Sequence, residues 1–209
     1  MADSTNSKKK KEWMQFVEPI RDLKKIAEIR KLLQFKWNIR NQLLFGLWIN
    51  SALRISDLLS IRIGDLFDEQ GNVKKEFSLK EKKTGKTHTV TITPKVETIL
   101  YEYRRTYPNI VKEPNNYVFF HRRDNVKGSK PIWRKMAWLM IRQRCKNVWL
   151  EGNYWWHTLR KTRWYQARKW GFSMEVIQEK LNHSNMQTTK RYLWITKEEV
   201  GDVCMKMDL

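Results

Sequence analysis

Residues 157–196 read HTLRKTRWYQARKWGFSMEVIQEKLNHSNMQTTKRYLWIT. His157 and Arg160 are three residues apart, so on a helix their side chains leave from one face and can approach one anion together. His183 and Tyr192 follow at short intervals. The stretch therefore predicts one polar site that is assembled from successive short helices.

Helix-capping residues divide this stretch. Gly171 is suited to end the first helix, and Ser173 can cap the next one, over residues 174–181. Ser184 and Gln187 have the spacing of a capping box, which would open the last helix. Taken singly these signals are weak, because a lone histidine is more often a structural hydrogen bonder and a lone tyrosine is usually part of the core.

The chain is strongly basic. Its 209 residues contain 42 Lys and Arg against 22 Asp and Glu, which gives a net charge of +20 and a sequence pI near 10.0. An excess of this size, spread along the chain, is typical of a polyanion binder, because each phosphate contact releases condensed counterions. We expect DNA or RNA as the partner; the alternative is a ribosomal or merely soluble basic protein.

Cysteine usage and hydropathy indicate an intracellular setting. Cys145 and Cys204 are too few and too far apart for a disulfide framework or a zinc site. The longest apolar run, residues 43–49, is too short to cross a bilayer, and we detect no signal peptide. We therefore expect a cytoplasmic protein without membrane association.

The chain reads as one domain preceded by a tail. Residues 1–12 are polar and include a run of lysines, which favours a disordered basic tail. Apolar residues at helical spacing from Arg21 onward predict an amphipathic helix, and residues 41–50 are apolar nearly all round, as in a helix at the centre of a domain. We assign residues 13–209 to a single compact domain.

A small antiparallel sheet is predicted in the middle of the chain. Alternating residues around Phe77 and Val90 indicate two strands, joined by a lysine-rich tip at residues 82–86. Such a tip is either a solvated loop or a finger that reaches into a DNA groove. Residues 117–120 are compatible with a third strand. The expected fold is mainly α with a small three-stranded antiparallel β-sheet.

Two further helices follow the strands. Thr93 and Pro94 have the pattern of a cap and a first helical residue. After Pro131 a helix is expected whose apolar stripe, which includes Trp133 and Met136, faces the core.

Arg54 lies in the largely apolar stretch ALRISDLL. A buried arginine is either salt-bridged or kept for an anionic ligand. From the residues alone a salt bridge is slightly favoured, with Asp57 or Asp65 as the partner.

Together these positions resemble the tyrosine recombinase (phage integrase) family, whose catalytic domain carries Arg, Lys, His-x-x-Arg, His and Tyr in this order. The resemblance covers roughly residues 21–209. The matching positions are Arg54 in ALRISDLLSIRIGDL, Lys83 in KKTGK, His157 and Arg160 in HTLR, His183 in LNHSN, and Tyr192 in TTKRYLWIT.

The chain departs from the family pattern in several places. Ala52 stands where the family often has Gly, Lys161 stands where His is common, and Asn182 precedes His183 where Gly is usual. None of these changes removes a reactive group. Most family members also carry a helical core-binding domain before the catalytic domain, and we expect no separate domain of this kind here.

The resemblance implies attack of a tyrosine on a DNA phosphodiester. Arg54 and Arg160 suit the non-bridging oxygens, because planar guanidinium groups bind two oxygens and stay protonated. Tyr192 is the expected nucleophile, and His157 is the candidate base that helps it to ionise. The expected product is a 3′-phosphotyrosine with a free 5′-hydroxyl, formed without a metal or nucleotide cofactor.

Two more residues complete the expected site. His183 would donate a hydrogen bond to the phosphate, and Lys83 would act as the general acid on the departing 5′-oxygen. Lys82 and Lys86 lie close to Lys83 in the sequence and compete for that role.

The leading hypothesis is a site-specific DNA recombinase or integrase, associated with a mobile element, that works on double-stranded DNA as a homo-oligomer, expected to be a tetramer. A directionality or accessory protein is a further expected partner. The alternatives are type IB topoisomerase-like relaxation of DNA and a catalytically silent DNA-binding accessory factor. The target sequence is not legible from the residues, because readout depends on which side chains reach the groove edges.

Overall fold

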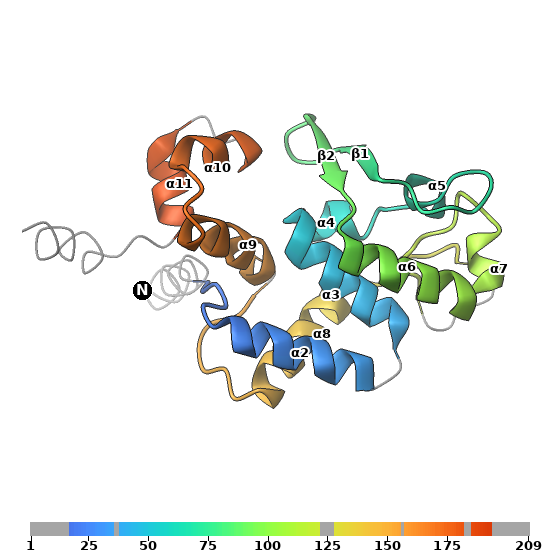
Figure 1. The fold of residues 1–209 in the computed structure, drawn as a ribbon, viewed down its shortest axis with the longest axis horizontal. Helices are drawn as coiled ribbons and strands as arrows, with labels where there is room; N and C mark the ends of the chain where they lie inside the picture. Colours follow the sequence, from blue (N-terminus) through green and yellow to red (C-terminus); the bar gives the residue numbers. More distant parts are fainter. Residues whose placement is uncertain (1–16, 36–37, 122–127, 156, 182–184, 194–209) are drawn as a thin grey trace, which may run out of the picture.

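The computed structural model describes residues 17–35, 38–121, 128–155, 157–181 and 185–193. It is mainly helical with one small sheet (Figure 1). In chain order the elements are α2 (Leu23–Phe35), α3 (Ile39–Ser51), α4 (Ile55–Leu58), α5 (Ile63–Leu66), β1 (Glu76–Lys80), β2 (Thr87–Thr91), α6 (Pro94–Thr106), α7 (Pro108–Val111), α8 (Arg134–Asn147), α9 (Thr158–Lys169), α10 (Met174–Leu181) and α11 (Met186–Tyr192).

Helix α3 forms the centre of the domain, as its apolar sequence predicts. Leu43, Leu44 and Trp48 are buried, and the helix packs against α2, α6 and α9. Its N-terminus is capped by the Asn38 side chain, which accepts a hydrogen bond from the backbone N–H of Asn41 at 3.1 Å. A helix apolar on all sides is stable only when it is covered on all sides, and these neighbours provide that cover.

Helix α3 ends at a left-handed residue. Ala52 has φ 53° and ψ 25°, a conformation that glycine adopts more readily than alanine does. This explains the family preference for glycine at the position. The turn directs the following residues, from Leu53 onward, back across the core towards α4.

The two predicted strands form an antiparallel hairpin. Phe77 lies opposite Val90, and both side chains are buried against the core. The tip is closed by a hydrogen bond from the Glu81 N–H to the Lys86 carbonyl at 2.9 Å. Gly85 has φ 67°, which a tight turn of this kind requires.

The predicted third strand is wrong. Among the described residues the sheet has two strands, β1 and β2. Residues 117–120 instead form two isolated bridges, between Tyr117 and Arg62 and between Phe120 and Pro131. Val118 and Phe119 are fully buried, so the apolar run that suggested a strand reflects burial between loops.

Two smaller predictions about helices are also corrected. Pro94 begins α6 as expected, but the Thr93 hydroxyl makes no capping hydrogen bond. On α8 the buried stripe consists of Ala137, Ile141 and Cys145, whereas Trp133 and Met136 are 73% and 52% exposed. The first turn of α8 extends beyond the core, and apolar residues there are not covered.

Helices α9, α10 and α11 stand together at one side of the molecule (Figure 1). Gly171 ends α9 as predicted, with φ 85° and a hydrogen bond from the Phe172 N–H to the Ala167 carbonyl at 3.2 Å. Ser173 caps α10 through its hydroxyl, which accepts from the Val176 N–H at 3.4 Å. Residues 182–184, and with them the Ser184 capping prediction, lie outside the described residues.

A segment before α2 fixes helix α9. The Ile20 N–H donates to the Thr162 hydroxyl at 2.8 Å, and Lys161 Nζ donates to the Val17 carbonyl at 2.8 Å. Gln166 donates to the Arg21 carbonyl at 2.8 Å. These contacts therefore tie α9 to a segment more than 140 residues earlier in the sequence.

Candidate active site

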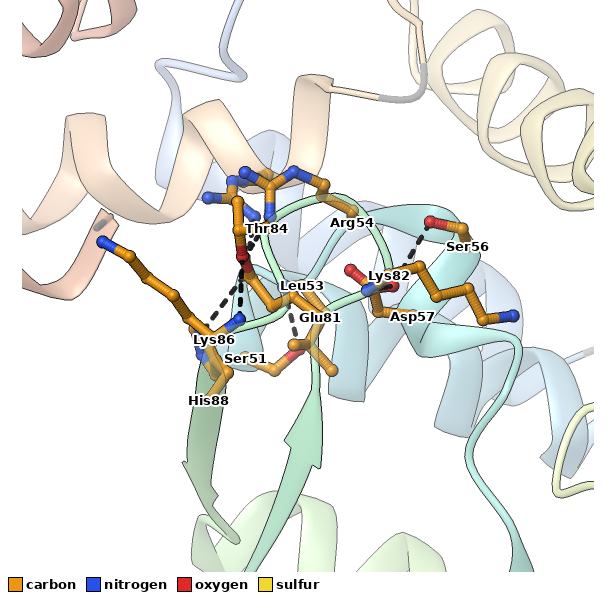
Figure 2. A network of polar contacts seen from close by, with 11 residues as sticks. Ser51, Leu53, Arg54, Ser56, Asp57, Glu81, Lys82, Thr84, Lys86 and His88 are labelled. Atoms are coloured by element: carbon orange, nitrogen blue, oxygen red, sulfur yellow. Dashed lines mark hydrogen bonds and ion pairs between the residues drawn. The ribbon is translucent and has the colours of Figure 1, made fainter. Parts of the chain in front are cut away.

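Arg54 is salt-bridged, but to a different partner from the predicted ones. Its Nη1 donates to Oε2 of Glu81 at 2.5 Å (Figure 2). Asp57 instead accepts a hydrogen bond from the Lys82 N–H at 3.1 Å, and Asp65 accepts from the backbone of its own helix turn. Arg54 precedes α4 in an extended conformation, and its side chain points towards Glu81 at the hairpin (Figure 2).

Arg160 reaches the same carboxylate from α9. Its Nη1 lies 3.9 Å from Oε1 of Glu81, and its side chain is 4% exposed. This Nη1 is buried and makes no hydrogen bond with any residue that the structure describes. A buried donor without an acceptor is costly, so Arg160 has unused capacity to bind an oxygen atom.

Tyr192 lies beside Arg160 at the end of α11. The guanidinium carbon of Arg160 is 6.0 Å from the centroid of the tyrosine ring, and Lys161 Nζ is 5.7 Å from it. The hydroxyl oxygen is buried, and this burial raises the pKa of Tyr192 to about 12, although the nearby Arg160 acts to lower it. The phenol is therefore protonated at neutral pH.

His157 sits at the N-cap of α9 and has a depressed pKa. The side chain as a whole is exposed, but desolvation of the ring and then the charges of Arg160, Lys161 and Arg54 lower its pKa to about 4. At neutral pH the imidazole is uncharged. One ring nitrogen is therefore free of a proton and able to accept one.

The hairpin tip places its lysines at the edge of this cluster. Lys83 is exposed, and its charge contributes to the lowered pKa of His157, so it lies within electrostatic reach of the site. Lys82 and Lys86 are exposed on the same turn. His183 lies outside the described residues, so its expected contact has no structural counterpart here.

Three residues of the site were not predicted from the sequence: Glu81, Thr84 and His88. Thr84 Oγ1 donates to Glu81 Oε2 at 2.6 Å, and His88 Nδ1 is 3.5 Å from Glu81 Oε1. Burial raises the pKa of Glu81, but the hydrogen bonds from Thr84 and Arg54 outweigh it and hold the pKa below its usual value. Glu81 is thus ionised at neutral pH.

A sequence signal for Glu81 did exist. Phe77 and Leu79 point inward on β1, so the two-residue period of a strand places Glu81 inward as well. A carboxylate at an inward position needs cations or donors around it. That argument would have identified Glu81 as a partner for a buried arginine.

The cluster as a whole remains electropositive. Two guanidinium groups face one carboxylate, and both His88 and His157 have lowered pKa values, so the histidines do not add charge at neutral pH. Burial is the main cause for His88. An arrangement of this kind binds an anion that offers several oxygen atoms, as a phosphodiester does.

A cleft adjoins the site. It has a volume of about 380 Å³ and lies between β2 and helices α9 and α10; its lining includes His88, Trp164 and Phe172. Among the described residues there is no group of three or more His, Cys, Asp or Glu that could hold a metal ion. In the same part of the chain no helix is long and apolar enough to cross a membrane.

The sequence matches a known family model. Residues 22–199 match the model of the phage integrase family. The chain is 35% identical over 187 residues to the probable integrase/recombinase YoeC of Bacillus subtilis, an alignment that covers 88% of this chain and 93% of that protein. It is 28% identical over 183 residues to the tyrosine recombinase XerA of Pyrococcus horikoshii, covering 87% of this chain but 60% of XerA.

Solved structures show the same fold. A crystal structure of XerA recombinase superimposes with a TM-score of 0.71 at 16% identity, covering 93% of this chain and 66% of that one. A post-cleavage complex of XerH site-specific recombinase bound to its palindromic difH substrate gives a TM-score of 0.66 at 17% identity, covering 90% and 53%. The present chain therefore spans between half and two thirds of the solved chains.

Proposed function

The chain belongs to the phage integrase family and is, by family and fold, a tyrosine-type site-specific recombinase; on that premise we propose that it cuts and rejoins DNA through a covalent bond between Tyr192 and a DNA phosphate. The observation that carries this proposal is the unused donor of Arg160. Its Nη1 is buried without a hydrogen bond, beside Arg54 and the ring of Tyr192.

The arginines supply charge stabilisation. Attack on a phosphodiester adds negative charge to the non-bridging oxygens in the transition state, and preorganised donors lower the energy of that state. Arg54 and Arg160 converge on one point from different elements, held in place by Glu81. A phosphate at that point gives the Arg160 Nη1 the acceptor that it lacks.

Tyr192 is the proposed nucleophile. A bond forms between its phenolic oxygen and phosphorus, while the bond from phosphorus to the 5′-oxygen breaks. The phenolic proton passes to His157, whose uncharged imidazole has a ring nitrogen that can accept it. Since burial raises the pKa of Tyr192 to about 12, the step needs both the base and the arginine charges.

Lys83 is the proposed general acid, and it donates a proton to the departing 5′-oxygen. Its position at the exposed hairpin tip allows it to approach a bound DNA strand. His183, outside the described residues, is assigned a hydrogen bond to the phosphate. The 3′-phosphotyrosine conserves the energy of the broken bond, so a 5′-hydroxyl from another strand can reverse the step without a nucleotide cofactor.

Double-stranded DNA is the proposed partner. Support comes from the net charge of +20 and from the DNA-bound state of the XerH structure, which shares this fold. We also propose that the chain acts as a homo-oligomer, a tetramer, on DNA, with residues 13–209 as the catalytic domain. A directionality or accessory protein completes the proposed set of partners.

Covalent trapping tests the proposal. The protein is incubated without metal ions with nicked duplexes that carry candidate attachment sites, so that a short strand is lost after cleavage and the adduct accumulates. We expect an adduct that survives denaturation and maps to Tyr192. Tyr192→Phe should give none, whereas Tyr165→Phe, which removes a hydroxyl from a buried ring on α9, should react like wild type.

Other outcomes would favour a different function. Salt-sensitive binding to a demonstrated site with no adduct from the wild-type protein would contradict the catalytic proposal and favour an accessory DNA-binding factor. Relaxation of supercoiled plasmid without strand exchange would favour a topoisomerase-like activity that uses the same tyrosine.

A further inference from the structure

Three separate parts of the chain meet at one buried carboxylate. Glu81, directly after β1, is bound by Arg54 from the start of α4 at 2.5 Å and by Thr84 from the hairpin tip at 2.6 Å (Figure 2). Arg160 of α9 lies 3.9 Å from the same carboxylate. His88 on β2 faces its other oxygen at 3.5 Å.

The three charged side chains differ in how much of their surface is exposed to solvent. Glu81 is 1% exposed, Arg160 is 4% exposed and Arg54 is 19% exposed. An anion that approaches from solvent therefore meets Arg54 first, whereas Arg160 and Glu81 are both almost fully buried. Glu81 is thus a buried partner of the arginines and not part of the surface that an anion contacts first.

Backbone contacts fix Glu81 in that position. Its N–H donates to the Lys86 carbonyl at 2.9 Å, and its carbonyl accepts from the Gly85 N–H at 2.8 Å. The next residue, Lys82, donates its N–H to Asp57, which is fully buried. Glu81 cannot withdraw without moving both the hairpin tip and its contact with α4.

We propose that Glu81 is a positioning residue, which holds the two arginines and the hairpin tip that carries Lys83 in a common arrangement around the scissile phosphate. The inference rests on the proposed function. Two guanidinium groups repel each other when they share a site, and a carboxylate between them removes that repulsion. The Thr84 hydroxyl binds the same carboxylate. The hairpin tip with Lys83, the proposed general acid, and the two arginines are therefore all positioned by Glu81.

The first test compares Glu81→Gln with Glu76→Gln. Both variants remove one negative charge from the same hairpin, but Glu76 is exposed and has no role in the site. Because a displacement of about 1 Å can cost about 100-fold in rate, Glu81→Gln should slow single-turnover adduct formation by at least about tenfold. Glu76→Gln should react at the wild-type rate. The dissociation constant for uncleaved DNA should change by less than about threefold in both, since most of the affinity comes from other phosphate contacts.

Two further variants distinguish a positioning role of Glu81 from an effect on folding. Glu81→Asp keeps the charge and should recover part of the lost rate. Thr84→Val removes the hydroxyl that ties the hairpin tip to Glu81 at 2.6 Å and that also accepts a longer hydrogen bond, at 3.4 Å, from the Lys86 N–H; because Thr84 is exposed, the fold should be unaffected. If Glu81→Gln does not fold, Thr84→Val decides the question, since its rate should still fall.

A modified substrate shows which group is misplaced. When the bridging 5′-oxygen is replaced by sulfur, the leaving thiolate needs little protonation, so the general acid becomes dispensable. Thr84→Val, like Lys83→Ala, should regain near wild-type rates on this substrate. Glu81→Gln should regain only part of its rate, because its arginines are misplaced as well.

The outcomes separate the two proposals. No adduct from the wild-type protein on either substrate would overturn the proposed function itself. Normal adducts from the wild type, with folded Glu81→Gln and Thr84→Val at wild-type rates, would overturn the role of Glu81 alone. Equal slowing of Glu81→Gln and Glu76→Gln would also overturn it, because the cause would then be net charge.

Discussion

The two halves of the candidate site are supported by very different amounts of buried structure. Arg54 and the hairpin rest on the main core, which extends from α2 to α8 and includes Leu159 at the start of α9. Among the residues that the structure describes, Tyr192 packs against a separate cluster in which three residues are fully buried: Ile177, Leu181 and Leu193. The described part of this cluster contributes little cooperative stability by itself.

This difference suggests that one half of the site is rigid and that the other half can adjust. The proposed anion-binding residues are set by the fold before DNA arrives, since α3 and the hairpin cannot move without disrupting the main core. The proposed nucleophile, Tyr192, is carried by helices whose burial is small in the described part of the chain, so its placement can adjust at a low cost in free energy. Helix α9 joins the two halves, with Arg160 in its first turn and Trp164 in contact with the small cluster.

The largest expected effect comes from the half of the site that the main core fixes before DNA binds, which we call the preformed half. Arg160→Gln should reduce single-turnover adduct formation by about 100- to 1,000-fold, the usual cost of losing one preorganised donor to a developing anion. Binding to uncleaved DNA should change much less. Arg163→Gln, which removes the same charge from an exposed position on the same helix, is the matched control and should leave the rate near wild type. Comparable slowing in both variants would refute the special role of Arg160.

The next effect tests whether the two cores are independent. Leu44→Ala, in the main core, should lower the free energy of global unfolding by about 2–5 kcal/mol. Leu193→Ala removes an equally buried leucine from the small cluster. It should lower global stability by less, because the small cluster can open without the main core. Its signature should be faster hydrogen exchange across residues 174–193 and slower adduct formation.

Denaturant titration and site-resolved hydrogen exchange provide these measurements. Equal losses of global stability in the two variants would contradict the comparison, since the cores would then unfold as one unit. A wild-type adduct rate in Leu193→Ala would show that the small cluster does not position Tyr192.

The sequence predicted the central helix and the hairpin because their signals are local. Helix α3 is apolar on all faces, and alternation around Phe77 and Val90 identifies both strands. The run at residues 117–120 was misassigned because a short apolar segment has no period that separates a strand from a buried loop.

Long-range pairing was harder to predict. The partner of Arg54 is 27 residues away, on a strand rather than on the next helical turn, so spacing alone pointed to the nearby Asp57. The convergence of Arg54, Arg160 and Tyr192 was expected from the family pattern, and the structure brings these three residues together. Strand alternation would have placed Glu81 inward, but its partners could not be read from any local pattern, because they come from segments that meet only in the folded chain.

The smallest expected effect concerns His157, which lies where the two halves join. Its pKa of about 4 is below the ordinary value of 6.5, owing to desolvation and to cations held by the main core. As the pH falls below 6.5, the unfolded chain binds a proton on this histidine before the folded chain does. His157 therefore favours folding above pH 6.5, and that contribution is lost between about pH 6.5 and 4. His157→Gln should lack this part of the pH dependence of unfolding.

The source of the low pKa can be assigned by combining variants. If cations of the main core set it, an NMR titration of the His157 ring should move to a higher midpoint in Arg160→Gln, because the neighbouring charge that most disfavours the imidazolium is gone. The midpoint should stay near 4 in Leu193→Ala, which loosens the helix of Tyr192 and leaves Arg54 and Arg160 in place. A shift of similar size in both variants would mean that the small cluster also orders the start of α9. The boundary between the preformed and the adjustable half would then lie before His157 rather than within α9.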